Sequence, residues 1–165
     1  MNRRINVSVE SIMVILLMII FAASITSLIY EGSVTYRNII NNKTEEENTR
    51  IALSYVNMRI KQNDVSNHIE ITKNGFDGED LLTIHHHDEE DGLQSFIYYK
   101  DGYLWECYTD TLLDHSLSTE VIAIQGINFD FVQDTNTIIT TIPFKNNNDY
   151  ISLSQASSLR SETNR

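Results

Sequence analysis

The chain has 165 residues with 12 basic and 23 acidic side chains, and its formal net charge is −11 at pH 7. After an N-terminal segment, this length leaves room for one domain of about 120 to 130 residues with a single core. Such an acidic surface repels nucleic acid phosphates, so direct nucleic acid binding is not expected. Cys107 is the only cysteine, which excludes an internal disulfide framework, and it is predicted to be a small buried residue of a strand.

An uncharged apolar segment at residues 12–30 is the most informative feature of the chain. As a helix it would extend roughly 28 Å, close to the thickness of the hydrocarbon core of a bilayer. Arg3 and Arg4 precede this segment, whereas the acidic run 45–47 follows it. The positive-inside rule therefore predicts a single-pass protein of the cell membrane, with residues 1–11 cytoplasmic and the C-terminal domain extracytoplasmic.

The alternative interpretation of this segment is a cleaved signal peptide. Ala22 and Ser24 are small residues with suitable spacing for cleavage before Ile25. Apolar character continues through Leu28 and Ile29, which favours a retained membrane span.

Residues 31–64 are predicted to form a helical stalk and then an amphipathic helix that ends near Asn63. Thr44 and Glu47 match the S/T-x-x-E capping box, which predicts a kink or a restart of the helix near Thr44.

An apolar stripe follows the capping box. Ile51, Tyr55 and Met58 recur at helical spacing and are flanked by Ala52 and Val56. This stripe is the predicted packing face of the amphipathic helix.

Beyond residue 64 the apolar period changes from about 3.6 to 2, which predicts an antiparallel sheet domain over residues 65–154 and a flexible Ser-rich tail at 155–165. Asp101-Gly102 separates two aromatic-rich segments and predicts a hairpin with a type I′ turn. Further strands are predicted at 69–72, 82–85, 127–131, 138–142 and 151–153. The strands at 127–131 and 138–142 are predicted to form a second hairpin. The fold class is therefore α+β, with an N-terminal transmembrane helix continuing into an amphipathic helix packed on an antiparallel β-sheet.

The start of the apolar segment resembles the N-terminus of type IV pilins and type II secretion pseudopilins. In Asn6-Val7-Ser8-Val9-Glu10-Ser11-Ile12-Met13-Val14, Glu10 stands in the position of that family's glutamate. The resemblance implies a pilin-like fold in which the Glu10 carboxylate meets the N-terminal amine of a neighbouring subunit. A carboxylate at the border of hydrocarbon requires such a partner.

Two positions depart from the pilin pattern. Ile5 stands where pilins have the glycine that precedes the cleavage point, and Asn6 stands where the mature chain usually begins with phenylalanine. These departures argue against processing by a prepilin peptidase. Glu10 then has an alternative role, in which its negative charge favours the dipole of the first helical turn.

A second resemblance covers most of the part beyond the span. Arg50-Ile51-Ala52-Leu53-Ser54-Tyr55-Val56, Arg59-Ile60-Lys61-Gln62-Asn63-Asp64 and Tyr99-Lys100-Asp101-Gly102-Tyr103-Leu104-Trp105-Glu106 are similar to an uncharacterised family of single-span proteins from Gram-positive bacteria of the Firmicutes. This resemblance implies a cell-surface protein encoded near pilus-like or secretion machinery.

One cluster contains possible metal ligands. In His85-His86-His87-Asp88-Glu89-Glu90-Asp91, alternation along a strand allows at most His85 and His87 to converge, with an acid from the loop. No distant pair of ligands completes a site, so the favoured interpretation is a solvated turn that ends at Gly92, without a metal or other cofactor.

Motifs for catalysis are missing from the sequence. It contains no Gly-rich phosphate loop, no G-x-S-x-G and no H-E-x-x-H, so no catalytic residue is assigned and an enzyme is not expected.

The sequence thus favours a non-enzymatic, pilin-like or minor-pseudopilin-like subunit of a pilus-like or type II secretion-like assembly. Its partners would be the membrane and other pilin-like subunits or an assembly-platform protein, contacted through Glu10, Ile51, Tyr55 and Met58. The alternatives are a membrane-tethered extracytoplasmic ligand-binding or sensing module, and a surface accessory protein with a metal-binding turn.

Overall fold

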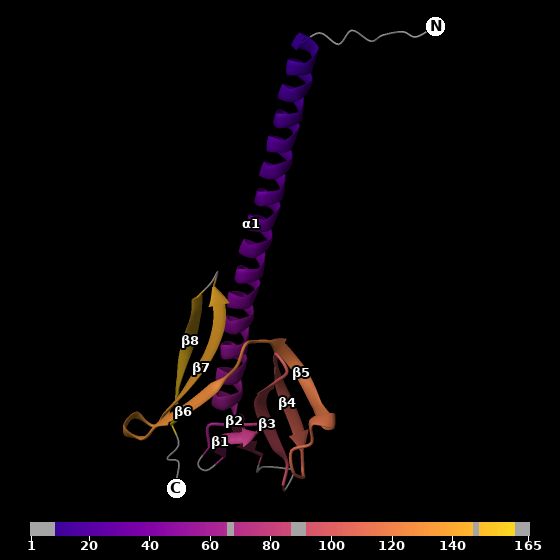
Figure 1. The fold of residues 1–165 in the computed structure, drawn as a ribbon. Coiled ribbons are helices and arrows are strands. Elements are labelled where there is room, and N and C mark those ends of the chain that lie inside the picture. The colour runs from indigo at the N-terminus through magenta and orange to yellow at the C-terminus, as the bar shows by residue number, and fades with distance from the viewer. Residues whose placement is uncertain (1–8, 66–67, 87–91, 147–148, 161–165) are drawn as a thin grey trace. The chain divides into compact units, whose positions relative to one another are not determined.

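The computed structural model describes residues 9–65, 68–86, 92–146 and 149–160. The chain divides into two compact units, Met1–Asn41 and Asn42–Arg165. One helix, α1 (Val9–Gln62), precedes two antiparallel sheets, and this arrangement confirms the predicted α+β fold class with an N-terminal apolar helix (Figure 1).

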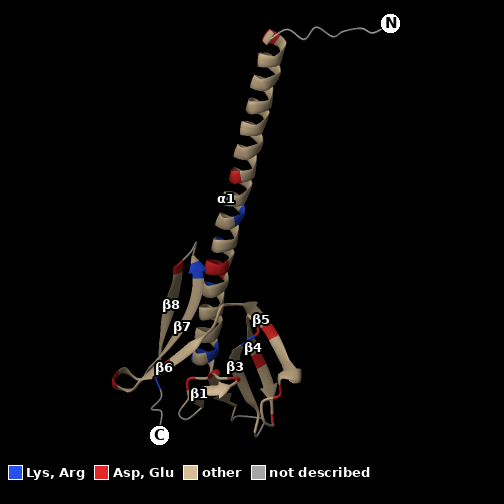
Figure 2. Cartoon of the chain, in the orientation of Figure 1, with Lys and Arg blue, Asp and Glu red and all other residues tan. Residues whose placement is uncertain are grey.

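The first unit contains the part of α1 that can span a membrane. No charged residue lies between Glu10 and Glu31, which is visible as a long tan stretch of α1 in Figure 2. Among the described residues, α1 is the one helix long and apolar enough to cross a membrane. The hydroxyls of Ser24 and Thr26 donate to the carbonyl oxygens four residues earlier, both at 2.9 Å, so their polar groups are satisfied inside the helix. This segment is therefore suited to single-pass membrane anchoring.

Helix α1 ends at Gln62, close to the predicted end near Asn63, but it has no restart at Thr44. The predicted restart is wrong because the polar segment has other sources of helix stability. Lys43 pairs with Glu47 at 3.7 Å, and Arg50 pairs with Glu46 at 2.8 Å, both across one helical turn. A capping box has no function inside a helix, where the backbone amides are already bonded.

The larger sheet is a meander of five strands in sequential order. Its strands are β1 (Ile69–Phe76), β2 (Glu79–His85), β3 (Gln94–Lys100), β4 (Tyr103–Thr109) and β5 (Ser118–Ala123). Asp101 and Gly102 both have positive φ, 50° and 88°, which confirms the predicted type I′ hairpin between β3 and β4. Strand β5 was not predicted, and it follows the short 3₁₀ helix η1 (His115–Leu117).

The smaller sheet contains β6 (Asn128–Val132), β7 (Thr137–Asn146) and β8 (Asp149–Ser158). The predicted second hairpin is confirmed, with η2 (Gln133–Thr135) and Asn136 at a φ of 47° making its turn. The predicted tail is wrong at residues 155–158, because the serine-rich segment pairs with β7 throughout. Hydroxyl groups contribute to this pairing, with Thr141 and Ser154 at 2.8 Å.

The predicted single sheet is wrong, because the structure has two sheets. The connector between β5 and β6 passes from the larger sheet to the smaller one. In the second unit both sheets lie against α1 (Figure 1). Their shared core is apolar throughout: Ala52, Leu53, Val56, Ile60, Ile69, Leu82, Ile84, Ile97, Leu104, Ile124, Ile127, Phe129, Ile138 and Ile142.

The predicted packing face of α1 is wrong in part. Leu53, Val56 and Ile60 point into the core, whereas Ile51 and Met58 are 56% and 44% exposed. Successive helical residues are rotated by about 100°, so Ile51 and Met58 lie on the face opposite the core. We call Ile51 and Met58 the outer face of α1.

Candidate functional site

The residues predicted to mediate assembly occupy three different environments. Glu10 lies in the first turn of α1 in the first unit. Ile51 and Met58 form the exposed outer face, and Tyr55 turns toward the larger sheet, where its hydroxyl donates to Glu106. The basic residues and the departures from the pilin pattern at residues 1–8 lie outside the described residues.

The histidine cluster is described only in part. His85 ends β2, and its Nε2 lies 3.6 Å from Oε2 of Glu70 on the neighbouring strand β1. His87 and the acidic residues 88–91 lie outside the described residues. Within the described ranges, no group of three or more His, Cys, Asp or Glu side chains is placed to hold a metal ion.

A polar cluster joins α1 to the larger sheet. Glu106 of β4 accepts a hydrogen bond from Arg59 Nη2 at 2.7 Å and another from the hydroxyl of Tyr55. Burial and the hydrogen bond to Glu106 raise the pKa of Tyr55 above its ordinary value of 10.0. The other carboxylate oxygen of Glu106, Oε1, is buried without a hydrogen bond to any described residue. This cluster positions the helix on the sheet, which explains why Tyr55 does not share the outer face.

A second polar cluster joins the two sheets. The Asp80 carboxylate of β2 is 9% exposed and accepts hydrogen bonds from the Phe129 backbone amide at 3.0 Å and from Lys73 Nζ at 2.8 Å. Burial alone would raise the pKa of Asp80, but these two donors outweigh it and lower that pKa below 3.8. Lys73 also reaches Asp130 of β6 at 2.9 Å. Asp80 is therefore a buried anion that fixes β6 beside β2.

The side of the larger sheet without α1 carries a smaller core around Tyr98 and Cys107, both buried, as predicted for the cysteine. The Tyr98 hydroxyl lies 2.7 Å from His115 Nδ1 and 2.6 Å from Ser118 Oγ. These bonds hold the segment between β4 and β5 over the sheet.

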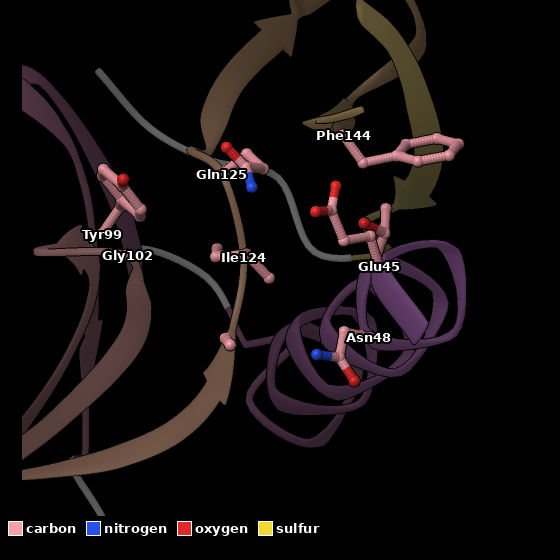
Figure 3. A pocket seen from close by; sticks show the side chains of 9 residues that line it. Glu45, Asn48, Tyr99, Gly102, Ile124, Gln125 and Phe144 are labelled. Carbon is pink, nitrogen blue, oxygen red and sulfur yellow. The ribbon is translucent and has the colours of Figure 1, made fainter. Parts of the chain in front are cut away.

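A cleft of about 220 Å³ opens where α1, the β3–β4 hairpin, the β5–β6 connector and β7 meet. Nine residues line it: Glu45, Asn48, Thr49, Tyr99, Gly102, Ala123, Ile124, Gln125 and Phe144. Figure 3 shows Glu45 and Asn48 on the helix facing Ile124 and Gln125 on the connector. Apolar rings and aliphatic groups alternate with amides in the lining, which is typical of sites for small molecules.

Glu45 brings the negative charge to this cleft. Its Oε2 accepts the backbone amide of Lys145 at 3.1 Å, and among the described residues it forms no ion pair. The adjacent Glu46 and Glu47 differ, because each is paired with a cation one turn away. Glu45 was not among the predicted site residues, although it differs from its two neighbours in having no basic residue four positions away.

Comparison with known proteins places the chain in a family. A family described as "Domain of unknown function (DUF4860)" matches residues 47–142, which is more than half of the chain. The chain belongs to this family. The DUF4860 match begins in the last part of α1 and ends within β7, so it covers the larger sheet, the connector and most of the cleft lining. No curated protein and no solved structure matches the chain.

Proposed function

We propose that this protein is a non-enzymatic, pilin-like or minor-pseudopilin-like subunit of a membrane-anchored assembly. The observation that carries the proposal is that α1, a single helix, has two exposed apolar surfaces. Its uncharged N-terminal segment requires lipid or other apolar helices, and its outer face exposes Ile51 and Met58. Other pilin-like subunits or an assembly-platform protein are the proposed partners.

The proposed orientation is an N-terminus in the cytoplasm and the unit Asn42–Arg165 outside the cell membrane. The resemblance at the N-terminus and the two arginines before the span support it. In this orientation Glu10 borders the cytoplasmic end of the span, where it would pair with a cation of a neighbouring subunit.

Site-specific photocrosslinking in living cells tests the assembly proposal. A photoreactive residue at Ile51 or Met58 should form crosslinks to a second membrane protein with an apolar N-terminal helix. Glu120, which is exposed on the edge strand β5, is the control position and should not form them. Replacing residues 9–40 with an unrelated membrane helix should reduce the crosslinks. The proposal fails if the outer face yields no membrane partner, or if the unrelated helix supports the same crosslinks.

The cleft favours a second candidate function, because a subunit of an assembly does not require such a site. A tethered extracytoplasmic module that binds or senses a small ligand would use a preformed concave site of this kind. Its four walls come from elements distant in sequence, and Glu45 is held on one of them by the Lys145 amide. Specific saturable binding of a small ligand to these walls would support this function.

A further inference from the structure

The connector wall of the cleft is held by contacts to the β3–β4 turn and to β7. The backbone amide of Ile124 donates to the Gly102 carbonyl at 3.0 Å, which ties the connector to the β3–β4 turn. Gly126 has a φ of 154°, and a Cβ there would lie 3.3 Å from Cγ of Pro143, so the connector also packs closely on β7. A ligand would therefore enter a site that already has its shape, which reduces the entropy lost on binding.

The charge of the cleft selects cations. Glu45 is the one acidic or basic residue among the nine described residues of the lining, and the Lys145 amide that it accepts carries no formal charge. An anionic ligand would be repelled by this carboxylate. A divalent metal ion would require several oxygen ligands with more negative charge than one carboxylate provides.

The remaining lining fits a short aliphatic chain. Ala123 and Ile124 contribute aliphatic surface to the lining, while the amides of Asn48 and Gln125 offer oxygen acceptors. At about 220 Å³ the cleft is smaller than sites for drug-sized ligands, which begin near 300 Å³. It has room for one side chain or a small amine rather than for a nucleotide or a sugar chain.

We propose that this cleft binds a primary ammonium group on a short aliphatic chain, with Glu45 as the counter-ion. The ammonium group donates to the free oxygen of Glu45 and to the amide oxygens, and its methylene groups lie against Ala123 and Ile124. A lysine side chain or the amino end of a peptide carries this chemistry. The inference rests on the second candidate function and names its class of ligand.

The test uses the full chain in lipid nanodiscs, with ¹³C-labelled isoleucine methyl groups observed by NMR. The Ile124 methyl resonance, assigned with an Ile124→Val variant, is followed during titration with n-butylammonium and, separately, with the neutral analogue n-butanol. We expect a saturable shift with n-butylammonium only. Glu45→Gln should weaken that binding about tenfold or more, because it removes a charge-assisted hydrogen bond. Glu46→Gln makes the same change in net charge on the neighbouring residue and should leave the affinity unchanged.

Two further probes distinguish the sources of the ammonium group. Nα-acetyllysine methylamide presents only a side-chain amine, and alanine methylamide presents only a chain-terminal amine. If n-butanol shifts Ile124 as well as n-butylammonium does, or if Glu45→Gln binds as tightly as Glu46→Gln, the ammonium proposal is wrong while ligand binding stands. If none of the probes shifts Ile124, the ammonium proposal is overturned, and the cleft no longer supports the second candidate function.

Discussion

Replacing Asp80 with asparagine should destabilise the second unit by weakening the junction between its sheets. The substitution keeps the size of the side chain but removes the charge that accepts hydrogen bonds from the Phe129 amide and Lys73. A hydrogen bond to a buried charged group contributes about 1.5–3 kcal/mol, and a pair with a half-exposed lysine adds at most about 1 kcal/mol. Because asparagine can still accept a neutral hydrogen bond from the Phe129 amide, worth about 0.5–1.5 kcal/mol, we expect a loss of about 1–2.5 kcal/mol at pH 7.

The assay is chemical denaturation of the full chain in detergent micelles, followed by the fluorescence of Trp105, the only tryptophan. The midpoint should fall without a change in the slope of the transition. Asp130→Asn is the matched control, because it removes the other partner of Lys73 from an exposed site. This control should change the stability by less than about 0.5 kcal/mol.

The pH dependence provides a stricter test of the same reasoning. The pKa of Asp80 is lowered in the folded state, so its contribution is complete above the unfolded value of 3.8 and disappears as the pH falls through the lower folded value. The difference in stability between the wild-type chain and Asp80→Asn should therefore be constant near neutral pH and shrink below pH 3.8. A difference of less than about 0.5 kcal/mol at pH 7, or one that persists in strong acid, would refute the assignment of Asp80 as a buried anion.

Four other substitutions test three separate parts of the structure. Leu53→Ala should lower the free energy of unfolding by about 2–4 kcal/mol because it leaves a cavity in the core. Ile51→Ala on the outer face should lower it by less than about 0.5 kcal/mol. Equal decreases in the denaturation midpoint would contradict the assignment of faces. Tyr98→Phe removes two hydrogen bonds and leaves the ring packed, so the thermal midpoint should fall by an amount equivalent to about 1–2 kcal/mol, and an unchanged midpoint would show that these bonds contribute nothing net. In NMR titrations of tyrosine side chains, Glu106→Gln should lower the raised pKa of Tyr55. The stability that the neutral Tyr55 hydroxyl contributes is complete below pH 10.0 and is lost as the pH rises through the folded pKa. Glu106→Gln should therefore also reduce this loss of stability at alkaline pH. A Tyr55 titration that the variant does not change would exclude the contact.

Local sequence chemistry predicted the elements whose structure depends on a few adjacent residues. Asp101-Gly102 specifies the β3–β4 turn because both residues adopt positive φ. The apolar segment 12–30 specifies the candidate membrane span, and Cys107 lies buried in a strand as predicted. The turn and the span depend on the identity of neighbouring residues, whereas the burial of Cys107 also needs the contacts of the smaller core.

The orientation of α1 depends on tertiary contacts that the helical period does not contain. Ile51 and Met58 form one apolar series, and Leu53, Val56 and Ile60 form another at equally good spacing. The second series is buried because the sheets pack against it. Tyr55 is drawn toward the larger sheet by Glu106, a residue of β4 that no local pattern associates with the helix.

The acidic residues of the second unit differ in how their charges are compensated, and this difference connects the fold to the proposed site. Glu106 and Asp80 each have a basic partner, Arg59 and Lys73, and both carboxylates serve to join elements of the fold. Glu45 accepts only a backbone amide, so its negative charge is not neutralised by any ion pair within the described residues, although it stands on the wall of a cleft. A carboxylate that is partly desolvated and unpaired favours binding of a cation more strongly than a solvated one does, because less hydration is lost when the ion pair forms. Of these three carboxylates, Glu45 is therefore the one at which a change of charge should alter ligand binding most and the stability of the fold least.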